Sequence, residues 1–218
     1  MNNFIFSSIG KKLIMSITGI FLIFFLLVHL CLNLLLLIGN GEVFEEAAHF
    51  MATNPAMKIM EYALAIGFIL HIIYSGYLTL LNYLARPVKY KMINRGETSS
   101  WSSRNMGITG VMVLIFLVIH LINYLYKIKF TDLIESGQIT KYELVIGLYK
   151  PEYWYFVVIY IVSFILLGLH LNHSLQSSFQ TLGWNNKIWG PRLKNISSIY
   201  ALIIAVGFSI IPLYFLIT

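Results

Sequence analysis

Four histidines are the side chains of this sequence best placed to do chemistry, because each lies inside a different long apolar segment. They are His29, His71, His120 and His170, and the chain has six histidines in all. A neutral imidazole binds transition metals and transfers protons near neutral pH. An ionisable side chain inside a membrane segment is costly and usually faces the interior of a helix bundle. A single such histidine would be explained equally well by a helix–helix hydrogen bond, whereas four on successive segments favour metal ligation or a proton path.

Two of these segments are near copies of each other. Residues 15–30 read MSITGIFLIFFLLVHL and residues 106–121 read MGITGVMVLIFLVIHL, and the two align without a gap. The copies share a methionine, a Thr-Gly pair and the histidine: Met15 and Met106, Thr18 and Thr109, Gly19 and Gly110, His29 and His120. A metal-binding side chain at the same place in both copies predicts a ligand shared between them.

Five apolar segments must position these histidines. They cover residues 12–38, 57–85, 105–126, 153–181 and 196–217, and each exceeds the roughly 20 residues that cross a bilayer as a helix. Hydrophobic residues make up 58% of the chain and charged residues 11%, which is typical of an integral membrane protein. The segments lack the alternating pattern of a membrane barrel. We therefore expect an all-α integral membrane protein whose five transmembrane helices form one bundle over residues 1–218.

The charges between the segments predict the orientation of this bundle. The N-terminus and the stretches 86–104 and 182–195 carry ten Lys or Arg and one acid, Glu97. The opposite side carries five Lys and eight acids. Because cytoplasmic loops are enriched in Lys and Arg, we expect a cytoplasmic N-terminus and an external C-terminus. The net charge of +6 then reflects topology, and we expect no nucleic-acid partner.

Spacing along the helices pairs the histidines by depth. His29 and His120 each lie about 25 Å beyond the basic residues on their inner side, at 1.5 Å per residue. His71 and His170 then form a second pair nearer the cytoplasmic side. Two histidines on facing helices are the usual ligands of a b-type haem, so two stacked haems would make an electron path across the membrane. Two nitrogen ligands per level fall short of the four ligands of a typical zinc site.

Other residues narrow the choice of cofactor. Cys31 is the only cysteine, which excludes a disulfide, an iron–sulfur cluster and a c-type haem attachment within the chain. No Gly-rich turn suggests a flavin or nicotinamide site. Thr18 and Thr109 lie eleven residues before the repeated histidines, about three turns away on the same helix face. The Thr-Gly pairs either leave room for a second macrocycle or simply pack the helices closely.

At this point the chain resembles the cytochrome b subunit of succinate:quinone oxidoreductases, in the branch where one five-helix polypeptide carries two haems b. The resemblance spans nearly the whole chain. Its motifs are SIGKKLIMSITG leading to His29, AAHFMATNP from Ala47 to Pro55, His71 in the second segment, SSRNMGITG leading to His120, and GLHLNHSLQSSFQTLGW around His170.

The resemblance implies a ligand set, partners and a location. His71 and His170 would ligate a proximal haem near the soluble subunits, and His29 and His120 a distal haem. A flavoprotein subunit that oxidises succinate and an iron–sulfur subunit would dock on the cytoplasmic face, so that FAD and iron–sulfur clusters belong to partners alone. Menaquinone would accept the electrons, and the complex would lie in a bacterial cytoplasmic membrane. The chain would then have no catalytic residue for the dicarboxylate.

One position departs from part of this family. Some fumarate-reducing relatives carry a glutamate two residues before the fourth haem histidine, where this chain has Gly168. This favours succinate oxidation over fumarate reduction. The family places its quinone site toward the distal haem, where Glu45, Glu46 and His49 are candidates for proton exchange or ordinary loop residues. His173 fits a propionate or helix partner better than a fifth ligand.

Two other classes of protein remain open from the sequence. One is a cytochrome b subunit of another respiratory enzyme, of the hydrogenase or formate dehydrogenase type, or of a quinol-oxidising fumarate reductase. The other is a haem-free transporter or scaffold whose histidines relay protons.

Overall fold

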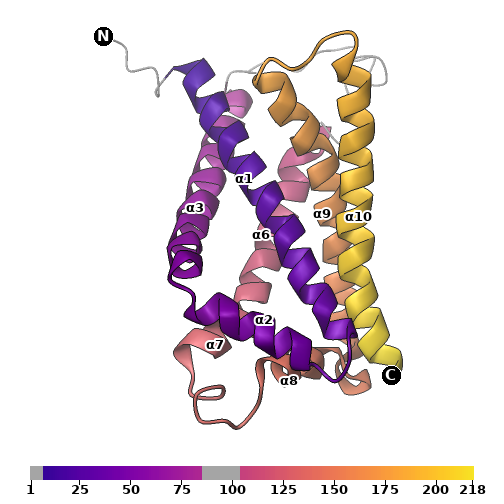
Figure 1. Cartoon of the computed structure of the whole chain (residues 1–218). Coiled ribbons are helices and arrows are strands. Elements are labelled where there is room, and N and C mark those ends of the chain that lie inside the picture. The colour runs from indigo at the N-terminus through magenta and orange to yellow at the C-terminus, as the bar shows by residue number, and fades with distance from the viewer. Residues whose placement is uncertain (1–6, 85–103) are drawn as a thin grey trace.

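Five long helices make up most of the chain (Figure 1). The computed structural model describes residues 7–84 and 104–218. The long helices of this part are α1 (Ser8–Leu34), α3 (Pro55–Leu84), α6 (Met106–His120), α9 (Trp154–Thr181) and α10 (Trp189–Ile217). A 3-10 turn, Leu35–Leu37, extends α1, while a π-helical turn, Leu121–Tyr126, and the short helix α7 (Lys127–Phe130) extend α6.

The predicted fold class is confirmed at this level. The described residues contain helices and no strand, and five helices are long and apolar enough to cross a membrane. The fifth begins at Trp189, seven residues before the predicted start at 196. The first turns of α10 carry Arg192 and Lys194, and these charged residues interrupt the apolar pattern without interrupting the helix. The third likewise continues to Phe130, beyond the predicted end at 126.

The connections gather at two ends of the bundle. Helices α2 (Glu42–Thr53) and α8 (Lys141–Ile146) lie at one end with the C-terminus, and the N-terminus and the α9–α10 connection lie at the other (Figure 1). This grouping agrees with the expected sides of the chain. The basic residues between 86 and 103, which are expected on the same side as the N-terminus, lie outside the described residues. Lys11 Nζ lies 3.3 Å from the Tyr77 hydroxyl and 4.8 Å from its ring centre, which joins the start of α1 to α3.

Helices α9 and α10 form the most closely packed part of the bundle. Val157, Tyr160 and Ile204 are at most 1% exposed. A Cβ added to Gly168 would lie 3.0 Å from Ala205 Cβ, so the two helices approach more closely here than a larger residue would readily allow. Small residues at a helix interface allow such contact within a membrane.

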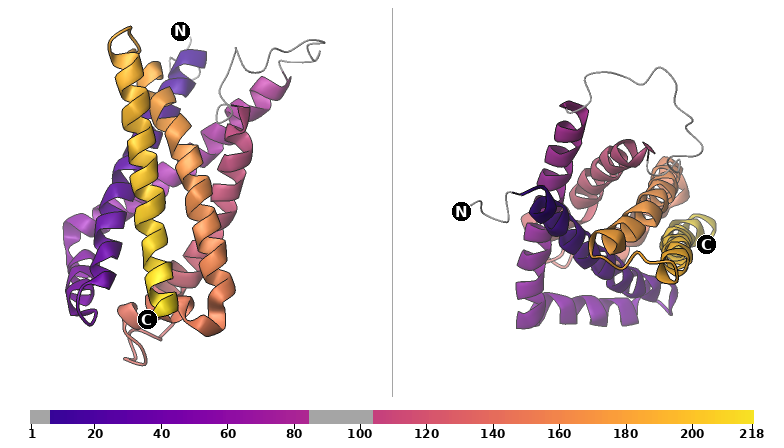
Figure 2. Two further views of the ribbon diagram at one scale, coloured as in Figure 1. Left: turned by 90° about the vertical axis from the view of Figure 1, so that its right-hand side faces the viewer. Right: turned by 90° about the horizontal axis from the view of Figure 1, so that it is seen from above.

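Helix α3 lies at the edge of the bundle. Seen along the helices, α3 and α10 lie on opposite sides, with α1, α6 and α9 between them (Figures 1 and 2). Gly67 is the single buried residue of α3, where it meets the Phe21 ring of α1. Most other apolar side chains of α3 are exposed, which suits a helix that faces lipid.

Candidate functional site

His29 and His120 meet inside the bundle. Their ring centres are 5.9 Å apart, with the planes 86° to each other. The two residues end equivalent copies of the repeat, so the same register on α1 and α6 brings them to one level. We call them the distal pair, and His71 and His170 the proximal pair.

Aromatic side chains surround the distal pair. Phe25 stacks on His29 at 5.2 Å between ring centres, and Phe208 of α10 lies 5.7 Å from it. On the other side, Phe116 and Tyr124 lie 5.8 and 5.0 Å from His120. Each of these rings except Phe208 is one helical turn from its histidine, a spacing that side chains on one helix face share.

The polar neighbours of the distal pair differ between its two members. The Asn33 amide donates to the His29 carbonyl at 2.8 Å and lies 3.4 Å from the His29 Nε2. Within the described residues, His120 Nδ1 is buried and has no hydrogen-bond partner. Asn33 was not anticipated from the sequence, although its place one turn after His29 is a readable signal.

The proximal histidines pack on the Thr-Gly pairs of the repeat. A Cβ added to Gly19 would lie 3.5 Å from His71 Cε1 and 3.8 Å from its Nδ1. The same atoms of His170 lie at 3.5 and 3.8 Å from a Cβ added to Gly110. Each glycine therefore makes room for an imidazole ring, on helix α1 for His71 and on helix α6 for His170.

The two pairs lie at two levels along the bundle. On α1 and on α6, the glycine that contacts a proximal histidine precedes the distal histidine by ten residues. At 1.5 Å per residue the levels are about 15 Å apart. The proximal level is the one nearer the N-terminal end of α1.

A tyrosine cluster beside His120 was not anticipated from the sequence. Tyr124 donates to the Tyr149 hydroxyl at 3.0 Å, and the Asn123 amide donates to the Tyr160 hydroxyl at 3.1 Å. Tyr149 comes from the loop before α9, and its burial raises the pKa of the phenol well above the usual value. Asn123 and Tyr124 lie on the π-helical turn, a local distortion that hydropathy does not reveal and that often marks functional sites.

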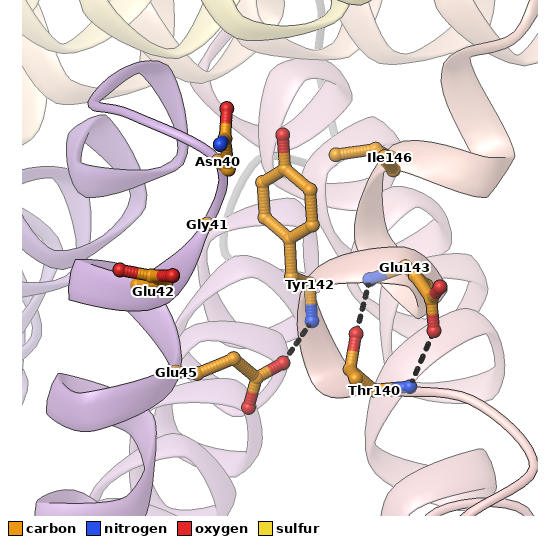
Figure 3. A pocket seen from close by; sticks show the side chains of 8 residues that line it. All are labelled: Asn40, Gly41, Glu42, Glu45, Thr140, Tyr142, Glu143 and Ile146. Atoms are coloured by element: carbon orange, nitrogen blue, oxygen red, sulfur yellow. Dashed lines mark hydrogen bonds between the residues drawn. The ribbon is translucent and has the colours of Figure 1, made fainter.

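The quinone candidates lie on α2, at the end of the bundle nearer the distal pair. Glu45 borders an open pocket of about 420 Å³ (Figure 3). The pocket is lined by Asn40, Gly41, Glu42, Glu45, Thr140, Tyr142, Glu143 and Ile146. The Tyr142 backbone N–H donates to the Glu45 carboxylate at 2.5 Å, which joins α2 to α8. Glu46 and His49 are exposed. None of the hydrogen bonds or ring contacts within 7–84 and 104–218 joins these three residues to the distal pair.

The arrangement of potential ligands fits two-ligand sites. Within the described residues, no three His, Cys, Asp or Glu side chains gather closely enough to hold a metal ion together. His29 and His120 come together from two helices, which suits a group held by two histidines, as a b-type haem is. No family model, curated protein or solved structure matches the chain.

Proposed function

We propose that this protein is the diheme cytochrome b membrane anchor of a succinate:quinone oxidoreductase. The observation that supports this most directly is the pair of histidine levels within a five-helix membrane bundle. At the distal level two imidazole rings lie 5.9 Å apart, and at the proximal level two further histidines pack on equivalent glycines. The family resemblance in the sequence supports the same function.

The residues at both levels suit a haem. Within the described residues, His120 and His170 each have a buried Nδ1 without a hydrogen-bond partner. Because a buried polar nitrogen without a partner is costly, these imidazoles lack the internal hydrogen bonds expected of histidines that serve only to hold helices together. Gly19 and Gly110 keep the space beside the proximal rings free of side chains, and apolar aromatic rings enclose the distal pair.

The proposed chemistry is one-electron transfer. A haem b with two histidine ligands supplies a reversible one-electron couple. His71 and His170 would hold the proximal haem, and His29 and His120 the distal one, each through a neutral ring nitrogen. The surrounding apolar side chains exclude water, and burial and hydrogen bonds to the ligand histidines are among the means by which a protein sets the reduction potential.

The proposed partners act at the two ends of the bundle. Flavoprotein and iron–sulfur subunits would dock at the end with the N-terminus and the α9–α10 connection, which would face the bacterial cytoplasm. Trp184, Ile188 and Trp189 of that connection are 59%, 65% and 49% exposed, among several basic residues. Menaquinone would be reduced at the opposite end. Of the proton-exchange candidates there, Glu46 and His49 are exposed, while the Glu45 carboxylate already binds α8.

The test is a reduced-minus-oxidised visible spectrum of the purified protein, together with the ratio of haem to polypeptide. We expect two haems b per chain and two spectral components. A protein without Soret absorption would instead be the haem-free proton-relay class. Copurification with hydrogenase or formate dehydrogenase subunits would show that the protein is a cytochrome b subunit of that enzyme and not of a succinate:quinone oxidoreductase. A reporter fused to the C-terminus should be active only outside the cell, and cytoplasmic activity would contradict the proposed orientation.

A further inference from the structure

In each copy of the repeat, a threonine directly precedes the glycine that contacts a proximal histidine. Thr18 precedes Gly19, which contacts His71, and Thr109 precedes Gly110, which contacts His170. A Cβ added to either glycine would lie at the same distances from the ring, 3.5 Å from Cε1 and 3.8 Å from Nδ1. The two glycines therefore approach their histidine rings in the same way.

At the first of these places the hydroxyl can serve only as an acceptor. Thr18 Oγ1 lies 2.9 Å from the Ile14 carbonyl and 3.1 Å from the Met15 carbonyl, so its hydrogen is used within its own helix. The same oxygen lies 3.4 Å from His71 Nδ1, at the long end of hydrogen-bond range. A hydroxyl oxygen keeps two lone pairs when its hydrogen is engaged. In that arrangement the Nδ1 that faces the hydroxyl oxygen carries the proton, and Nε2 is the basic nitrogen of His71.

At the second place, the histidine nitrogen has no hydrogen-bond partner within the described residues, although the threonine of the repeat offers a possible acceptor. His170 Nδ1 is buried without a hydrogen-bond partner. Thr109 is 3% exposed, and its hydroxyl lies 3.1 Å from the Met106 carbonyl and 3.3 Å from the Asn105 carbonyl. Its hydrogen is therefore directed into its own helix, as at Thr18.

We propose that Thr18 and Thr109 are positioning residues that accept the Nδ1–H of His71 and His170 and thereby fix the tautomer that offers Nε2 to the iron. This inference rests on the proposed haem function. A histidine ligand whose second nitrogen donates a hydrogen bond is oriented by it and is a more basic ligand. A more basic ligand stabilises oxidised iron, so the two hydroxyls lower the reduction potential of the proximal haem.

The distal pair offers an internal control, because within the described residues no hydroxyl hydrogen-bonds to a ring nitrogen of His29 or His120. The His29 ring nitrogens lie 3.5 and 3.4 Å from the Asn33 amide nitrogen, a donor, and His120 Nδ1 has no partner there. Loss of the two threonine hydroxyls should therefore change the proximal haem and leave the distal haem as it is.

The experiment compares Thr18→Val, Thr109→Val and the double variant with the matching Ser variants, in the purified full-length protein. Val keeps the shape of Thr without its hydroxyl, and Ser keeps the hydroxyl. Thr79→Val is the control, since Thr79 is exposed on α3 and its methyl lies 4.0 Å from a Cβ added to Gly107. The measurements are the two midpoint potentials by redox titration, the electron paramagnetic resonance signals of the two low-spin irons, and the haem content.

We expect the proximal potential to rise in each Val variant, more in the double variant, with the proximal resonance signal shifted and the distal component unchanged. The Ser variants and Thr79→Val should match the unchanged protein. Two bound haems with an unaltered proximal potential in the double Val variant would overturn the proposal, as would an equal shift of both haems. If the Val variants do not accumulate, Thr18→Ala and Thr109→Ala remove the same hydroxyls with a smaller side chain. A wild-type protein without haem would instead refute the proposed function itself.

Discussion

The imidazole rings of His29 and His120 lie 5.9 Å apart inside the bundle, although the two residues end different copies of the repeat. They come from α1 and α6, which hold equivalent places in the two halves of the chain. The proximal histidines come instead from α3 and α9 and pack on the glycine at the fifth position of each copy of the repeat. Each level thus combines one side chain from each half of the chain.

The first prediction concerns which histidines act together. Under the proposed function, His29→Ala and His120→Ala should each remove the same spectral component, because each would remove one of the two histidines that would hold that haem. His71→Ala and His170→Ala should each remove the other component. The measurement is the reduced-minus-oxidised spectrum with the haem content, which should fall from two to one per chain.

Two histidines serve as controls for this series. His49 is exposed on α2, and His173 is half-buried on α9. His49→Ala and His173→Ala should retain both haems. If His29→Ala and His71→Ala abolished one and the same component, the pairing by level would be wrong.

The second prediction concerns the glycines that contact the proximal rings. Gly19→Ala should be tolerated, because its Cβ would make ordinary contacts of 3.5 Å with His71 and 3.6 Å with Ser178. Gly19→Leu would place side-chain atoms in the space that the His71 ring fills. It should therefore cause loss of the proximal spectral component, with the distal one retained. Gly76→Leu on α3 is the control for size, since nothing lies within 4 Å of a Cβ there. Equal haem contents in Gly19→Leu and Gly76→Leu would contradict this role of Gly19.

The membrane helices and the repeat could be predicted because apolar length and sequence identity are local features of the chain. Depth counting along straight helices also put His29 and His120 at one level, where the structure has them. The contacts that depend on backbone irregularity were missed. Asn123 and Tyr124 meet Tyr160 and Tyr149 through a π-helical turn and an interhelical loop, which no hydropathy pattern encodes.

The role of the Thr-Gly pairs also could not be decided from the sequence. Sequence alone left close helix packing and room for a macrocycle equally open. In the structure Gly19 and Gly110 meet histidine rings. Close helix-to-helix packing occurs instead at Gly168, whose neighbours on α10 are far away in sequence and could not be read from it.

The third prediction tests that tight packing. A Cβ at position 168 would lie 3.0 Å from Ala205 Cβ and 3.3 Å from the Ala201 carbonyl oxygen, and the backbone atom cannot move aside cheaply. Gly168→Ala should therefore destabilise the protein by about 1–3 kcal/mol through overpacking. The measurement is the midpoint of thermal unfolding in detergent. Gly76→Ala, in open space on α3, should leave the midpoint unchanged or raise it slightly. An equal midpoint for both variants would show that α9 and α10 do not pack this closely.

The fourth prediction concerns the turn into α2. Gly41 has φ +89° and its Cβ position lies 2.5 Å from the Tyr142 ring, so Gly41→Ala meets both backbone strain and a clash. Gly39 has φ +64° with nothing within 4 Å, so Gly39→Ala isolates the strain, about 1–2 kcal/mol. We expect the larger loss of thermal stability for Gly41→Ala. Tyr142→Ala should recover part of that loss in the Gly41→Ala background, and its failure to do so would assign the whole effect to the backbone.

The last prediction concerns the direction in which charge crosses the membrane. In the proposed function, electrons enter at the cytoplasmic end of the bundle and reach menaquinone at the outer end. A membrane potential that is negative inside repels electrons outward, so this transfer is favoured by about 2.3 kcal/mol per electron at 100 mV. That contribution assists transfer from succinate to a quinone of low potential, which is otherwise uphill. Dissipating the potential in intact cells or vesicles should therefore slow succinate–menaquinone activity, while succinate oxidation by an artificial dye that accepts electrons from the soluble subunits continues at its original rate. Because the dye reaction involves no charge movement across the bilayer, it controls for damage to the soluble subunits. Equal slowing of both reactions would rule out outward electron transfer through this chain.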